Sequence, residues 1–218
     1  GFRFLTFTLS RVLTQPTHTN QRQMCKTNVQ KTAEADFVPV IASVLNHLTQ
    51  RNKEVQNANE KLKAFHSQRI PSINVADYLD RIVKYSYASQ ECFIFALVYL
   101  DRLVTKNPNC YITPYNVHRL LITSVLLAAK SRDDWYYSNA YYSTLGGVTN
   151  QELNKLEVTF LQLIDFELFI SPTTFELYKN ELVSRTKPSS TKKIAKASKT
   201  SPTAMVEDEE PQVAPQVA

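Results

Sequence analysis

The sequence contains very little of what a β-rich or nucleotide-binding fold needs. Only three glycines occur among 218 residues, at positions 1, 146 and 147. So few glycines argue against a turn-dense β fold and against a glycine-rich loop that cradles a phosphate. No segment shows the strict alternation of apolar and polar residues that is typical of half-buried strands. The sequence therefore predicts an all-α fold, made of one domain with tails or at most two small domains.

Cysteine and histidine are also scarce, and their spacing does not indicate a metal site. The three cysteines form no CxxC pair, and one of them, Cys92, lies in an apolar run. We therefore expect reduced thiols in an intracellular protein, with no disulfide framework, no metal and no cofactor. The four histidines have no ligand spacing either, and we expect His118 to lie at a boundary of the core. These cysteines and histidines are Cys25, Cys92, Cys110, His18, His47, His66 and His118.

No apolar run is long enough to cross a bilayer without a break. The longest, residues 92–100, is too short, and the longer stretch 112–129 is interrupted by His118 and Arg119. We therefore predict no transmembrane helix and no membrane partner. The net charge of +5 is also small, and the tail from residue 185 onward carries +2 of it. The remaining net charge of +3 produces only a weak electrostatic field, so we expect no nucleic-acid partner.

The two ends of the chain differ in composition from its middle. Residues 1–35 hold five basic residues and no acid before Glu34, which leaves two interpretations: an organelle transit peptide, or an unstructured leader or non-native start with Met24 as the true first residue. Residues 185–218 are predicted to be a disordered tail, first basic and then acidic. Its lysines are either a weak nuclear signal or simply solvated, so we expect the nucleus, the cytoplasm or both. Ser201, which precedes a proline, is a candidate phosphosite.

Between these ends, helical periodicity dominates. Apolar residues from Phe37 to Leu48 predict an amphipathic helix after Asp36, and residues 49–69 are predicted to be a frayed extension or connector. About six helices are then expected over residues 70–184. Their start signals are Ser89, Thr149 with the capping-box spacing to Glu152, and Ser171 before Pro172.

The stretch 112–130 is predicted to be the central helix. Thr113 is a good N-cap, and Pro114 suits the first helical position. From Leu120 to Ala129 only two small residues are polar, which is typical of a helix buried among others. The helix ends at Lys130, so we expect a core helix that presents a fixed cation at the surface.

Sequence motifs of catalysis are absent. No GxSxG, P-loop or HExxH sequence occurs. The adjacent Asp133 and Asp134 do not make an acid–base pair, because neighbouring side chains seldom face one substrate; such a loop aspartate more often caps the following helix. We therefore predict that the protein is not an enzyme.

Several blocks of sequence, in the right order, resemble the cyclin box. Residues 99–102, Tyr-Leu-Asp-Arg, are similar to its second helix, and residues 116–130 to its third. Residues 139–142, 146–148 and 154–157 are similar to the fourth and fifth helices. The specific resemblance, over roughly residues 37–184, is to the P-type (U-type) cyclins of plants and the related phosphate-signalling cyclins of fungi and protists.

The resemblance implies a fold and a partner. The fold is a single five-helix cyclin box over residues 70–184 with a short C-terminal helix, preceded by an added N-terminal helix and connector over 36–69. The partner is a cyclin-dependent protein kinase, which the chain would bind and activate in cell division or phosphate signalling. Lys130 and Glu157 would reach the kinase αC helix. The structural cyclin-box positions would be Asp101, Arg102, Leu120, Leu121 and Ala128.

The sequence also departs from the family pattern. The docking motif of mitotic members is missing from the first helix, so that docking patch is in doubt. The family's buried arginine falls near Ser72, so Asp101 needs another partner, for which we expect Arg81. Ser131 follows Lys130 where many relatives have Phe. Two alternatives to a kinase activator stay open: a non-activating helical adaptor, and a cyclin-fold transcription factor that contacts DNA.

Overall fold

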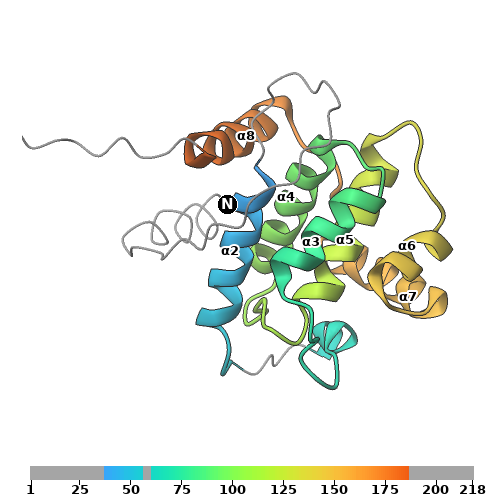
Figure 1. Cartoon of the computed structure of the whole chain (residues 1–218). Helices are drawn as coiled ribbons and strands as arrows, with labels where there is room; N and C mark the ends of the chain where they lie inside the picture. The colour runs from blue at the N-terminus through green and yellow to red at the C-terminus, as the bar shows by residue number, and fades with distance from the viewer. Residues whose placement is uncertain (1–36, 56–59, 187–218) are drawn as a thin grey trace, which may run out of the picture. The chain divides into compact units, whose positions relative to one another are not determined.

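The computed structural model of the chain describes residues 37–55 and 60–186, and all of them lie in the first of two compact units. Over these residues every regular element is helical (Figure 1), which confirms the predicted all-α fold. The elements are α2 (Val38–Arg51), the 3-10 helix η2 (Glu60–Phe65), α3 (Val75–Tyr85), α4 (Gln90–Lys106), α5 (Val117–Arg132), α6 (Asn139–Gly146), α7 (Asn150–Leu163) and α8 (Pro172–Thr186).

Helix α5 forms the centre of the core. All ten residues from Leu120 to Ala129 are buried, as the nearly uniform apolar composition of this stretch predicts. Helices α3, α4, α6 and α7, together with η2, all pack against it. The remaining two, α2 and α8, pack against each other and, respectively, against α3 and α4.

The ends of α5 differ from the prediction. The helix begins at Val117, because Thr113 to Asn116 form a separate turn in which the Thr113 N–H donates to Asn116 Oδ1 at 2.8 Å. The hydroxyl of Thr113 makes no hydrogen bond in the described part of the chain, so Thr113 is not the cap. At the other end the helix continues past Lys130 to Arg132. Lys130 therefore lies in the last turn rather than at the last residue.

Asp133 ties the end of α5 to the beginning of α4. Its carboxylate accepts hydrogen bonds from the Ser89 hydroxyl at 2.6 Å, the Ser89 N–H at 3.0 Å and the Cys92 thiol at 3.2 Å. The prediction that this aspartate caps the following helix is wrong, since it binds the start of an earlier one. Burial, together with Asp133, raises the pKa of Cys92 to about 12, so the thiol stays protonated and unreactive.

The connector after α2 contributes to the core. We predicted a frayed or connecting segment, yet Leu62 and Phe65 on η2 are both fully buried. The Phe65 ring meets the ring of Phe160 on α7 edge to face, with 6.0 Å between centroids. This connecting segment therefore supplies two side chains to the core, which its polar sequence did not predict.

Helix α8 is longer than the short C-terminal helix that we predicted. It continues to Thr186, two residues beyond the predicted end, and Arg185 pairs with Glu181 one turn earlier. The predicted leader over 1–35, the Asp36 cap, the rest of the basic and acidic tail and the candidate phosphosite Ser201 lie outside the described residues. Among the helices that are described, none is long and apolar enough to span a bilayer.

Candidate functional site

Lys130 and Glu157 lie side by side at the surface. Lys130 is in the last turn of α5 and Glu157 is in the middle of α7, and their Nζ and Oε1 atoms are 2.6 Å apart. The side chain of Lys130 is 30% exposed and that of Glu157 is 14% exposed. The two predicted kinase-binding residues, 27 positions apart in sequence, thus form one ion pair whose cation is the more accessible partner.

The positions of both residues follow from local sequence. Lys130 is favoured near the C-terminus of α5 because the helix dipole is negative there. Glu157 directly follows Leu156, which is buried in the α7 stripe with Leu153 and Phe160, so its carboxylate emerges at the rim of the core. Because α7 packs along α5, the rim of one helix faces the end of the other.

One asparagine from α6 completes the cluster. Asn139, the first residue of α6, donates one amide N–H to Glu157 Oε2 and the other to Asn154 Oδ1, both at 2.7 Å. Three helices therefore meet at this ion pair. Periodicity and motif spacing do not reveal the role of Asn139, because its partners are 15 and 18 residues away on another helix.

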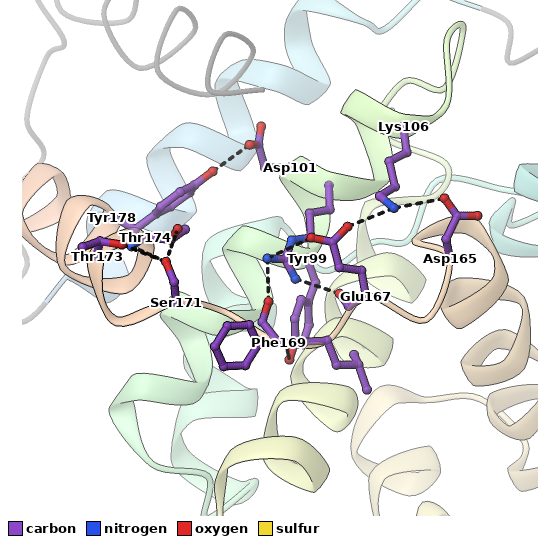
Figure 2. Close-up of polar contacts among 12 residues, drawn as sticks. Tyr99, Asp101, Lys106, Asp165, Glu167, Phe169, Ser171, Thr173, Thr174 and Tyr178 are labelled. Atoms are coloured by element: carbon purple, nitrogen blue, oxygen red, sulfur yellow. Dashed lines mark hydrogen bonds and ion pairs between the residues drawn. The ribbon is translucent and has the colours of Figure 1, made fainter.

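Asp101, a predicted structural position, is bound by the C-terminal helix. It is buried on α4, and its Oδ2 accepts a hydrogen bond of 2.6 Å from the hydroxyl of Tyr178 on α8 (Figure 2). The expected partner, Arg81, instead donates to the Thr144 carbonyl oxygen at 3.2 Å, so that prediction is wrong. Burial of Tyr178 and the neighbouring Asp101 carboxylate raise the pKa of the phenol, which therefore remains a donor.

Arg102 anchors the segment between α7 and α8. Its guanidinium donates to the carbonyl oxygens of Glu167 and Phe169, each at 2.7 Å. Lys106, one turn further along α4, binds the carboxylates of Asp165 and Glu167 at 3.0 Å each, as Figure 2 shows. The hydrogen bond from Lys106 lowers the pKa of Glu167. These contacts place α8 where Tyr178 can reach Asp101.

The other predicted cyclin-box positions are core residues, whereas the side chain of Ser131 binds a neighbouring helix. Leu120, Leu121 and Ala128 on α5 are all buried. Ser131, which occupies the place of the family's phenylalanine, shares a hydrogen bond of 2.9 Å with the hydroxyl of Tyr99. Its side chain therefore binds α4.

A groove lies beside α3, where the resemblance places the docking patch of mitotic cyclins. Its volume is about 230 Å³, and its lining includes Tyr78, Arg81, His118 and Arg119 but no acidic residue. His118 Nε2 lies 2.9 Å from the carbonyl oxygen of Ile73, which requires the proton on Nε2 and leaves Nδ1 buried without a partner in the described residues.

We expect His118 to make folding stability depend on pH. Burial lowers the pKa of His118 below 6.5, while its bond to Ile73 opposes this shift. Below pH 6.5 the unfolded chain therefore takes up the proton first, and the free energy of unfolding falls as the pH drops toward the folded-state pKa. Urea titrations at about pH 7.5 and about pH 5.5 should show that the free energy of unfolding falls less between these two pH values for His118→Gln than for the parent. Part of the fall should persist in the variant, because burial also lowers the pKa of His66.

The described residues form an all-α domain with an ion pair at its surface. Among these residues there is no cluster of metal-ligating side chains. The family model described as Cyclin matches residues 5–168, and the chain belongs to the cyclin family. The match begins upstream of α2, within the residues predicted from composition to be a leader.

The chain is similar to curated cyclins of plants. It is 44% identical to Cyclin-U1-1 of Arabidopsis thaliana over 143 residues, which cover 64% of this chain and 68% of the relative. It is 42% identical to Cyclin-U4-1 of the same plant over 145 residues, with coverages of 65% and 72%. It is 38% identical to Cyclin-P4-1 of Oryza sativa subsp. japonica over 154 residues, with coverages of 66% and 73%.

These similarities confirm the predicted likeness to the P-type and U-type branch. Membership of the family implies a regulatory role toward cyclin-dependent kinases and not an enzymatic activity. A role in phosphate signalling stays a prediction.

Proposed function

We propose that this chain is a regulatory subunit that binds a cyclin-dependent protein kinase and activates it by holding the kinase αC helix in its active position. The observation that carries the proposal is the Lys130–Glu157 pair at the surface of a cyclin domain. Both side chains come from rigid helices that pack together in the core, so the pair presents a fixed donor and a fixed acceptor to another protein.

The chemistry of the pair suits an exposed backbone. An ammonium group has three N–H donors, and one of them is used by Glu157. The remaining donors of Lys130 can bind carbonyl oxygens of the partner, and free lone pairs of Glu157 can accept amide N–H groups. A helix end is the part of a protein where such backbone groups lack partners.

An exposed apolar side chain next to Glu157 supports an interface there. Val158, which follows Glu157 on α7, is 53% exposed, and Phe166, shortly after the end of α7, is 63% exposed. Phe166 and its neighbour Asp165 have φ angles of 56° and 54°, in the left-handed region that costs energy without glycine. This backbone strain beside an exposed apolar side chain makes Phe166 a candidate for a further contact, beyond the C-terminal end of α7.

Activation then follows from a population shift. In an active kinase, a glutamate on αC pairs with the lysine that binds ATP phosphates. A subunit that binds αC only in this position increases the population of the active state by its difference in affinity between the two states. No catalytic group from the subunit is needed. We also propose that the complex acts in the nucleus, the cytoplasm or both.

The test is a kinase assay on purified components. The full chain is mixed in turn with each member of a panel of monomeric cyclin-dependent kinases, and both binding and phosphate transfer to a peptide are measured. We expect no activity from the chain alone and strong stimulation of at least one kinase that it binds. Binding without stimulation would favour the adaptor alternative. A salt-dependent shift of duplex DNA without kinase binding would favour the transcription-factor alternative.

A further inference from the structure

The carboxylate of Glu157 is held from two sides by two different helices. Lys130 from α5 binds Oε1 and Asn139 from α6 binds Oε2. The amide orientation of Asn139 follows from its contact with Glu157 Oε2, because an ionised carboxylate oxygen can only accept a hydrogen bond. An amide nitrogen carries two hydrogens, and each is used here.

The backbone that carries Asn139 is itself anchored. At the start of α6, the Ser138 side chain caps the helix by accepting the Tyr141 N–H. At the end of α6, Gly146 lies so close to α5 that a Cβ atom there would be 2.9 Å from Cγ1 of Ile122, which is fully buried. Asn139 is therefore attached to a helix with little freedom to move relative to α5.

The hydrogen bond from Asn139 to Glu157 is important because the Glu157 carboxylate is largely buried. The Glu157 side chain is only 14% exposed, and a largely buried carboxylate needs its oxygens satisfied. The Lys130 side chain is long, and ordering such a side chain at the moment of binding costs affinity. If Asn139 fixes the carboxylate, the carboxylate in turn fixes the ammonium group, and that ordering is completed when the chain folds.

We infer that Asn139 is a positioning residue for the kinase contact, which acts through Glu157 to hold Lys130 Nζ in its binding position. This inference rests on the proposed function. It assigns Asn139 no contact with the kinase. Its effect on binding must therefore depend on the presence of Glu157.

A double-mutant cycle tests this dependence. The measurement uses one kinase from the panel that the chain binds. Its dissociation constants for the parent, Asn139→Ala, Glu157→Ala and the double variant are measured by calorimetry. We expect Asn139→Ala to weaken binding about tenfold in the parent and less than about twofold in the Glu157→Ala background. Asn154→Ala is the matched control: it removes the other hydrogen bond of Asn139 and should change the affinity by less than about twofold.

The remaining outcomes separate the inference from the proposed function. Equal weakening by Asn139→Ala in both backgrounds would overturn the inference, because the residue would then act without Glu157. No weakening by Asn139→Ala, while Glu157→Ala weakens binding, would also overturn it and leave the proposed function intact. If neither Lys130→Ala nor Glu157→Ala weakens binding, the proposed contact itself fails. Asn139→Asp keeps the shape but lacks the donors, and it should weaken binding at least as much as Asn139→Ala, with an unchanged helical circular dichroism spectrum.

Discussion

Exchanging the two charges of the surface pair, Lys130→Glu together with Glu157→Lys, is expected to abolish kinase stimulation while the protein stays folded. The exchanged pair can still form across α5 and α7, since the two side chains lie 2.6 Å apart in the parent. The Asn139 amide can rotate and present its oxygen to the new lysine. The partner, however, would meet a carboxylate where it needs a donor and an ammonium group where it needs an acceptor.

The expected loss of affinity is on the order of 100-fold, because mismatched charged groups at a contact typically cost 2–5 kcal/mol. The free energy of unfolding should change by less than about 2 kcal/mol, because the ion pair is retained in reverse, while the glutamate at position 130 loses the favourable dipole position of Lys130 and the largely buried site of Glu157 receives a lysine. Kinase assays and urea titrations of the same preparation measure both quantities.

The chain provides a matched control for this experiment. Arg119 and Glu152 form a second ion pair between α5 and α7, at 2.7 Å and with side-chain exposures of 23% and 33%. Exchanging their charges alters the same two helices away from Lys130 and should leave stimulation of the kinase intact. If the Lys130–Glu157 exchange stimulates the kinase as well as the parent does, the assignment of the contact is wrong.

Phe65→Ala should destabilise the domain by about 3–5 kcal/mol, although it lies in a segment with a polar sequence. The Phe65 ring is fully buried and packs against Phe160, while η2 contacts both α5 and α7. Alanine would leave a cavity in the wall of the core that the surrounding helices cannot close without moving. Denaturation followed by far-ultraviolet circular dichroism gives the change in the free energy of unfolding.

Lys63→Ala, two residues earlier on the same 3-10 helix, is the control. The Lys63 side chain is 58% exposed, and its partner Glu60 is 79% exposed. Loss of the Lys63 side chain should change the free energy of unfolding by less than about 0.5 kcal/mol. Equal and small effects at both positions would mean that η2 does not contribute to the core.

The sequence alone was sufficient for most of the local interactions, although not for the start of α5, where Thr113 is not the cap. Apolar periodicity predicted that residues 112–130 form a buried central helix, because a helix buries whichever face is apolar. Thr149 caps α7 as predicted, since its side chain needs only the Glu152 N–H three residues away, at 3.1 Å. The capping box is only half formed, however, because the Glu152 carboxylate binds Arg119 on another helix.

The sequence by itself thus determined the helices, their order and the presence of a cation near the end of a core helix. The tertiary structure alone decided which side chains meet: Tyr178 with Asp101, Asp133 with the start of α4, and Asn139 with Glu157. It also decided that Leu62 and Phe65 are core residues. The physical reason is that periodicity and capping act over three or four residues, whereas these contacts join residues 18 to 77 positions apart or lie in segments too short to show a period.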